Sequence, residues 1–143
     1  MHRALAHRSW CAEHPGEPSN ERLEFLGDAV LGVIITDYLF TEHPDRPEGW
    51  LSPARASLVR GGTLASIAKE LDVGAAIRLG KGEELTGGRE KPSILADAVE
   101  ALIGAVYLDG GIDAASALVR RLYGDRLTAI GALTLPTDQT AVH

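Results

Sequence analysis

The sequence predicts an all-α fold in a single domain. No segment of any length alternates apolar and polar residues with the period of two that a half-buried strand requires. Two long stretches, 20–41 and 93–108, contain no proline and are apolar on nearly every side of a helix. Helices of this kind belong inside a domain, and 143 residues are enough for one compact domain with its own core.

Short elements are expected before the first long helix. Residues 2–10 can form a short helix with Leu5 facing inward, and prolines and a glycine break the chain over 11–19. Asn20 is a favourable N-cap for the long helix that follows. Apolar residues then recur at helical spacing, and this stripe consists of Leu23, Leu26, Val30, Val33 and Ile34.

Two shorter helices are expected in the middle of the chain. Ser52 followed by Pro53 forms an N-cap and N1 pair, which predicts a helix from there through Arg60. Thr63 is the expected cap of the next helix. The stretch 77–92 is polar and rich in glycine, and its irregular pattern predicts no regular element.

The C-terminal third predicts two helices and a tail. The second long helix ends where Asp109-Gly110-Gly111 interrupts the apolar pattern, and an amphipathic helix begins near Asp113. No periodicity continues beyond it, so the domain is expected over 1–130 and a frayed tail over 131–143. The inward residues of the amphipathic helix are expected to be Leu118, Leu122 and Leu127.

Composition excludes several classes of protein. The single Cys11 cannot form an internal disulfide, so a reducing cytoplasm is the simplest compartment. No signal peptide, no 18-residue uncharged apolar run and no phosphate-cradling P-loop is visible, so neither a membrane nor a nucleotide cofactor is expected. The net charge of −6 has the wrong sign for a nucleic-acid-binding protein unless acids bind metal and basic residues surround them.

Carboxylates interrupt the apolar surface of both long helices. Glu21, Glu24 and Asp28 lie on one side of the first helix, and Asp97 and Glu100 share a face of the second. If the two helices pack with these faces together, Glu24 and Asp28 meet Asp97 and Glu100 as four oxygen ligands. Such a set selects Mg²⁺, for which Mn²⁺ can substitute, and a hydrated Mg²⁺ can activate water against a phosphodiester.

Two other interpretations of the carboxylates stay open at this point. Acidic pairs at helical spacing often form a solvated face, and buried salt bridges to Arg22, Arg55 or Arg60 would also neutralise them. The five histidines have no mutual spacing that suggests a metal set or a catalytic triad.

Both acidic helices resemble motifs of the ribonuclease III family of double-stranded-RNA endonucleases. Residues 21–31, ERLEFLGDAVL, are similar to its signature motif, and residues 93–105, SILADAVEALIGA, resemble its second acidic helix. Residues 4–10 and 48–61 are similar to its flanking segments, so the resemblance extends to about residue 127. It implies a ribonuclease III-like helical bundle acting as a homodimer, with one Mg²⁺-dependent centre per subunit. Each centre would cut one strand, leaving 5′-phosphate and 3′-hydroxyl ends with two-nucleotide 3′ overhangs.

The resemblance also implies roles for individual residues. Asp28 and Glu100 would be catalytic, Glu21 an accessory acid, and Phe25 would enter a socket on the partner subunit. An alternative is that Phe25 belongs to the core of its own chain. By motif position the metal ligands would be Glu24, Asp28, Asp97 and Glu100.

The sequence departs from the bacterial pattern because nothing after Gly131 could form a double-stranded-RNA-binding domain. Duplex RNA would then be bound through its phosphates and 2′-hydroxyls by a basic rim, with weak sequence preference. A rival interpretation is a catalytically weak or inactive homologue that acts as a dimeric RNA-binding or scaffolding module, although none of the expected metal ligands is missing. The expected rim residues are Arg55, Arg60, Lys81, Arg89 and Lys91.

Overall fold

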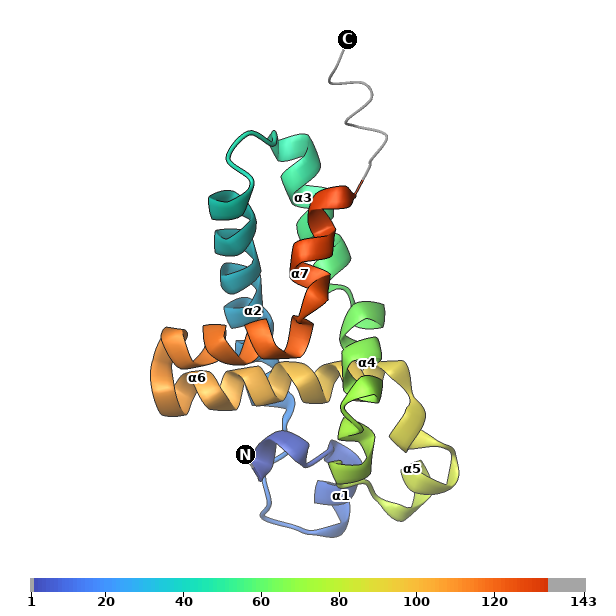
Figure 1. Cartoon of the computed structure of the whole chain (residues 1–143). Helices are drawn as coiled ribbons and strands as arrows, with labels where there is room; N and C mark the ends of the chain where they lie inside the picture. Colours follow the sequence, from blue (N-terminus) through green and yellow to red (C-terminus); the bar gives the residue numbers. More distant parts are fainter. Residues whose placement is uncertain (1, 134–143) are drawn as a thin grey trace.

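The computed structural model describes residues 2–133, and this part of the chain is helical, as predicted (Figure 1). Its only β pairing is an isolated bridge between Ala6 and Arg78. The α-helices are α1 (Arg8–Glu13), α2 (Glu21–Glu42), α3 (Glu48–Val59), α4 (Gly61–Glu70), α5 (Lys81–Leu85), α6 (Pro92–Tyr123) and α7 (Asp125–Ala129). Short 3-10 turns lie at Arg3–Leu5, Val73–Ala76, Gly88–Glu90 and Ile130–Ala132.

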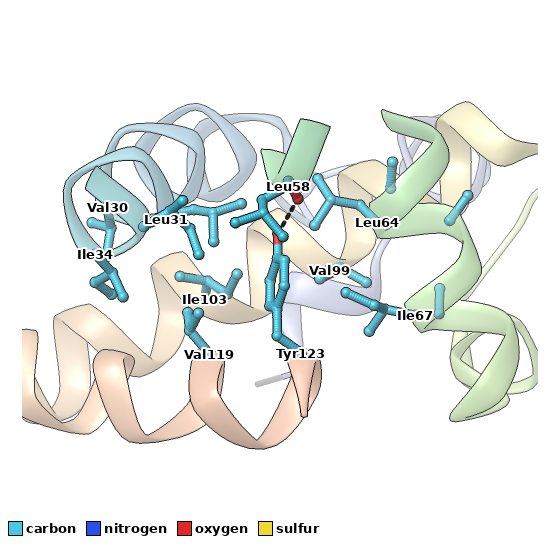
Figure 2. Packing of buried hydrophobic residues seen from close by; sticks show 14 of the residues in the cluster. Val30, Leu31, Ile34, Leu58, Leu64, Ile67, Val99, Ile103, Val119 and Tyr123 are labelled. Atoms are coloured by element: carbon cyan, nitrogen blue, oxygen red, sulfur yellow. Dashed lines mark hydrogen bonds between the residues drawn. The ribbon is translucent and has the colours of Figure 1, made fainter. Parts of the chain in front are cut away.

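The core forms where α2 and α4 pack against α6 (Figure 2). Tyr123 lies at its centre, where burial of the ring is combined with a hydrogen bond from its hydroxyl to the carbonyl oxygen of Leu58, 2.7 Å away. This bond connects the end of α6 to α3. The apolar side chains around the ring come from α2, α4 and α6 and include Val30, Leu31, Ile34, Leu64, Ile67, Val99, Ile103 and Val119.

Helix α6 reverses direction at Gly111, so its two halves lie side by side (Figure 1). Gly111 has φ 80° and ψ −172°, a backbone conformation that side chains disfavour. The predicted interruption at 109–111 is therefore confirmed. Within residues 2–133, α6 alone has the length and composition of a membrane-spanning helix, but it bends back on itself and its first half packs on α2 as a core helix.

The second half of α6 uses a different inward face from the predicted one. Its fully buried residues are Ala115, Val119 and Tyr123, whereas Leu118 and Leu122 are only partly buried. The Tyr123 ring and its hydrogen bond to Leu58 place that face inward. Leu127, beyond the break at Gly124 and within α7, is buried as expected.

The predicted helix over 2–10 was wrong. Ala6 is buried in an extended conformation, and its carbonyl oxygen accepts a hydrogen bond from the backbone N–H of Asn20. The helical path therefore stops at Leu5 and resumes at Arg8. Asn20 also does not cap α2 with its side chain, because its amide donates to the carbonyl oxygen of Ala4, 3.1 Å away. Asn20 thus joins the N-terminal segment to α2.

Helix α3 begins at Glu48, four residues before the predicted start, and Pro53 lies inside it. The reason is Trp50, whose fully buried ring draws this turn into the core, a tertiary contact that overrides the local signal. Thr63 does not cap α4, because α4 already begins at Gly61 and the Thr63 hydroxyl donates to the Ser57 carbonyl. The stretch 77–92, expected to be irregular, contains α5 and a 3-10 turn.

Three side chains hold the end of the described chain, one each from α2, the α2–α3 corner and α3. We call them the C-terminal clamp: Tyr38, Arg46 and Trp50. The Tyr38 hydroxyl donates to the carbonyl of Leu127 at 3.1 Å, the Arg46 guanidinium to Gly131 at 3.1 Å, and the Trp50 indole to Leu133 at 3.0 Å. Residues 131–133 are therefore packed, although a tail was predicted from 131. The rest of that tail, 134–143, lies outside the described residues.

Candidate metal centre

The crossing of α2 and α6 brings three of the four predicted ligands together. One carboxylate oxygen each from Glu24, Asp97 and Glu100 lie within 4.8 Å of one another. Glu100 is 9% exposed, and the other two are half-buried. Asp28 is exposed and lies outside this group, but its carboxyl is close enough to share a hydrogen bond with Glu100. The face-to-face packing predicted from spacing alone is therefore present.

Two glycines allow the helices to approach this closely. A Cβ atom on Gly27 would lie 1.7 Å from the carbonyl oxygen of Glu100, and one on Gly104 would lie 2.4 Å from that of Leu23. Both contacts are between backbones, so no side-chain rotation could relieve them. The crossing point therefore lies within one turn of the acidic residues on both helices.

No basic side chain forms an ion pair with these acids within the part of the chain that the structure describes, although the charges of His7 and Arg8 act to lower the pKa of Asp97. The ion pairs found there join Arg89 to Glu84, Lys91 to Glu83 and Arg126 to Glu70. None of the arginines considered from the sequence pairs with Glu24, Asp97 or Glu100, which contradicts the salt-bridge interpretation. The burial of Glu100 likewise excludes a simple solvated face.

Burial raises the pKa of all three carboxyls, and mutual repulsion adds to the shift at Glu24 and Glu100. Burial raises the pKa of Glu100 to about 9, and the hydrogen bond and charge of Asp28 add to the shift. Burial also raises the pKa of Glu24 to about 7, with a contribution from the charge of Asp97, and it raises the pKa of Asp97. A set of oxygen donors without a compensating cation fits a hard divalent metal ion.

The stability of the metal-free protein should fall as the pH rises from 7 to 9. In this window the folded state keeps the proton on Glu100 that the unfolded chain, with carboxyl pKa values near 4.5, has already lost. Glu24, with its pKa raised to about 7, adds to the effect only at the lower end of the window. Because the folded state binds more protons, the free energy of unfolding decreases with pH. Melting temperatures recorded in EDTA at pH 7, 8 and 9 measure this effect. A constant or rising melting temperature would contradict the assigned cause.

A cavity of about 350 Å³ lies beside the acidic cluster and has residues of both charges on its walls. Sequence reasoning missed His7, Arg8 and Glu83 here. His7 accepts a hydrogen bond from the backbone N–H of Ser9, 3.1 Å away, which caps α1, and burial lowers the pKa of its imidazole. The walls of the cavity are formed by His7, Arg8, Asn20, Glu21, Glu24, Glu83, Lys91, Ser93, Ile94 and Asp97.

The ribonuclease-III-like family model matches residues 1–127 of this chain. The chain belongs to the ribonuclease III family.

Relatives in this family support the assignment over most of the chain. Ribonuclease 3 of Streptomyces coelicolor is 60% identical over 121 residues, which are 85% of this chain and 44% of that protein. Ribonuclease 3 of Thermobifida fusca is 57% identical over 133 residues, 91% of this chain and 55% of that protein. The chain thus spans about half the length of these curated relatives.

Solved ribonuclease III structures share the fold. The nuclease domain of ribonuclease III from Campylobacter jejuni superposes with a TM-score of 0.79 at 45% identity, covering 85% of this chain and 82% of that one. Dicer from Pichia stipitis superposes with a TM-score of 0.65 at 29% identity, covering 80% of this chain and 52% of that one. The predicted ribonuclease III-like helical bundle is therefore confirmed.

In this ribonuclease III chain, one of the predicted RNA-binding residues lines the cavity. Lys91 lies on its wall and forms a 2.5 Å ion pair with Glu83. Arg89 is instead held by the carbonyl oxygens of Gly74 and Ile77, at 2.9 and 2.6 Å, and by Glu84. Its guanidinium therefore orders the chain between α4 and α6, which leaves Lys91 as the better candidate for a phosphate contact.

The other three predicted RNA-binding residues lie away from the cavity walls. Arg55 is exposed on α3 and donates to the Thr36 hydroxyl at 3.2 Å. Arg60 is exposed at the junction of α3 and α4, and Lys81 is exposed at the start of α5. The structure does not bring these side chains together into one basic patch.

One face of α2 is exposed and apolar. Phe25 is 83% exposed, Phe40 is 73% exposed and Val33 is 60% exposed. A hollow of about 630 Å³ runs along the same face, between α2 and α3. The expectation that α2 is buried on every side was therefore wrong for a single subunit. The alternative that Phe25 belongs to the core of its own chain was also wrong.

Proposed function

We propose that this chain is the endonuclease domain of a ribonuclease III that cleaves double-stranded RNA by metal-assisted phosphodiester hydrolysis. The products would carry 5′-phosphate and 3′-hydroxyl ends with two-nucleotide 3′ overhangs. The observation that carries the proposal is the uncompensated cluster of Glu24, Asp97 and Glu100 at the α2–α6 crossing. The identity to proteins named Ribonuclease 3 supports it. The catalytic domain would extend from residue 1 through 133, because the C-terminal clamp holds residues 131–133, and it would act in the cytoplasm.

Four carboxylates would hold the cation, which we propose to be Mg²⁺, with Mn²⁺ as a substitute. Glu24, Asp97 and Glu100 form the preassembled part, and Asp28 would complete it from its place beside Glu100. Bound there, the metal supplies an activated water and neutralises charge on the phosphodiester. Because Glu24 and Glu100 must release protons to become ligands, affinity for the cation should rise with pH. Glu21, on the cavity wall, is the accessory acid.

We further propose that the exposed face of α2 is the homodimer interface. Phe25 would insert into the partner subunit, since an exposed phenyl ring in a stripe with Val33 and Phe40 is typical of an interaction surface. The Campylobacter jejuni domain has a region involved in dimer formation, which supports a dimer here.

The direct test is incubation of the purified chain with a perfect duplex RNA of ~30 base pairs, roughly three helical turns and long enough to reach two centres, at low salt. Parallel reactions contain Mg²⁺ or EDTA. We expect Mg²⁺-dependent cuts on the two strands, offset by two nucleotides. An intact duplex with shifted mobility would support the rival scaffolding function, and an intact, unshifted duplex would overturn both proposals for this chain.

The ion pair between Glu83 and Lys91 should weaken RNA binding, because it competes with an RNA phosphate for the Lys91 ammonium group. Glu83→Gln would release Lys91 for a phosphate, and because surface ion pairs are weak, affinity should rise by up to about fivefold. Lys91→Met should lower the affinity for RNA. It should also reduce the slope of log affinity against log salt concentration by about one, because one fewer counterion is released. Fluorescence anisotropy with a labelled duplex in EDTA measures both effects.

Glu84→Gln is the matched control, because Arg89, its partner, remains held by backbone carbonyls. An equal gain in RNA affinity for Glu84→Gln and Glu83→Gln would show that the gain comes from the change in net charge. It would contradict a specific role for Lys91.

A further inference from the structure

The glycines at the α2–α6 crossing are placed where they control the acidic cluster. Gly27 lies between Glu24 and Asp28 on α2, and its missing Cβ leaves room for the carbonyl oxygen of Glu100. Gly104 lies one turn after Glu100 on α6 and receives the carbonyl oxygen of Leu23. Each glycine thus touches the backbone of a proposed ligand residue, or of its immediate neighbour, on the opposite helix.

The separation of the two helices determines how far apart their carboxylates lie. The carboxylates of Asp97 and Glu100 come from α6 and that of Glu24 comes from α2, so any widening of the crossing separates Glu24 from the other two. Aspartate side chains are too short to follow a large movement. Packed helices usually lie 8–10 Å apart, roughly, and small residues at the contact allow the closer approach seen here.

Divalent cations differ in the oxygen spacing that they require. Mg²⁺ demands near-octahedral geometry with ligand distances of about 2.0–2.1 Å, whereas Ca²⁺ accepts irregular geometry at about 2.3–2.6 Å. A narrow crossing therefore suits the smaller cation. We propose that Gly27 and Gly104 are positioning residues that set the width of the cation site and so favour Mg²⁺ over Ca²⁺. This inference rests on the proposed function, because it takes the acidic cluster as a metal site.

Gly32 provides a control position for the two glycines at the crossing. Gly32, also within α2, has no atom within 4 Å of the position of a Cβ, so an alanine would fit there. At Gly27 a Cβ would need the helices to move apart by more than an ångström, and at Gly104 by somewhat less. Alanine at the crossing thus changes the width of the site, whereas alanine at Gly32, on the exposed face of α2, leaves that width unchanged.

The experiment is calorimetric titration of the full chain with Mg²⁺ and with Ca²⁺, without RNA, at 10 °C. The variants are Gly104→Ala, Gly27→Ala and the control Gly32→Ala, each first examined by circular dichroism. Changes that disturb ligand orientation lower metal affinity by roughly 10–100-fold. We expect Gly104→Ala to lose Mg²⁺ affinity in this range and to lose less Ca²⁺ affinity, so that the affinity ratio moves toward Ca²⁺ by about tenfold. Gly27→Ala should move it further, and Gly32→Ala should keep the ratio of the unchanged protein.

Each outcome is decisive. An unchanged ratio in folded Gly104→Ala would overturn the inference, and so would unfolding of Gly104→Ala at 10 °C, because the inference requires helices that separate and remain packed. Failure of the unchanged protein to bind either cation at millimolar concentration would instead refute the proposed metal centre. The two failures are thereby distinguished without any measurement of RNA cleavage.

Discussion

Glu100→Gln should abolish RNA cleavage while making the metal-free protein more stable at pH 7.5. Glutamine keeps the shape of the side chain but cannot supply an anionic ligand, so cleavage should fall by at least a hundredfold, more than is typical for residues that only support a ligand. Stability should change in the opposite direction, because the pKa of Glu100 is raised to about 9 in the folded state. At pH 7.5 ionisation of Glu100 lowers the free energy of the unfolded chain but not that of the folded one. Glutamine does not ionise, so the free energy of unfolding of the variant should be larger.

The expected gain is on the order of 2 kcal/mol, since each unit of pKa shift corresponds to about 1.4 kcal/mol and part of the shift is relieved by relaxation. This corresponds to a rise of several degrees in melting temperature for a domain of this size. Differential scanning calorimetry in EDTA measures it, and a duplex cleavage assay with Mg²⁺ measures the loss of activity. Glu42→Gln, an exposed change at the end of α2, is the control and should alter neither property.

Cleavage at near the normal rate by Glu100→Gln would refute the proposed role of Glu100. A lower melting temperature would show that the ionised carboxylate stabilises the fold, contrary to the raised pKa. The two measurements are independent, so the electrostatic argument can fail while the catalytic one holds.

Phe25→Ala should weaken the dimer more than any other single change on the exposed face of α2. Aromatic anchors that insert into a partner typically contribute about 2–4 kcal/mol to association, so the dissociation constant should rise roughly 30- to 1,000-fold. The fold of each subunit should be unaffected, because the ring is 83% exposed and contributes little to the core. Sedimentation velocity over a concentration series measures the change.

Leu85→Ala is a matched control for Phe25→Ala. Leu85 is 86% exposed and apolar but lies on α5, away from the α2 face. If the effect of Phe25 were only a general loss of exposed apolar surface, the two variants would behave alike. Equal sedimentation of Phe25→Ala and the unchanged protein at micromolar concentration would refute the proposed interface.

The central features of the fold follow from local signals in the sequence. The long apolar helices and the break at Asp109-Gly110-Gly111 were predictable because glycine and helical periodicity act over a few residues. The convergence of Glu24 with Asp97 and Glu100 was predictable because acids on apolar helices have few places where they can be neutralised. Their roles in binding metal and cleaving RNA remain predictions.

The errors occurred where distant contacts override local preference. Asparagine is a common helix-capping residue, yet the side-chain amide of Asn20 donates its hydrogen bond to the carbonyl oxygen of Ala4. Ser52 and Pro53 look like a helix start, yet burial of Trp50 extends the helix backwards. No local pattern identifies such partners, because they depend on which segments meet in the folded chain.

The residues around the cavity beside the metal centre could not be predicted from local patterns either. His7, Glu83 and Lys91 come from three separate segments, and only folding places them around one space. The exposed face of α2 illustrates the converse case. Periodicity alone predicts that its apolar residues belong to the core, and only the family resemblance assigns Phe25 to a partner subunit. Sequence periodicity does not distinguish a face buried within a chain from one available to a second copy.

The C-terminal clamp determines where this domain can be shortened. A version ending at residue 127, where the family match stops, would lack the carbonyl oxygen of Leu133 that accepts from the Trp50 indole. Because the Trp50 side chain is fully buried, its N–H would then lack an acceptor in the interior, at a penalty of about 1–3 kcal/mol. The smallest stable expression unit should therefore extend through Leu133, beyond residue 127, where the match to the family model ends.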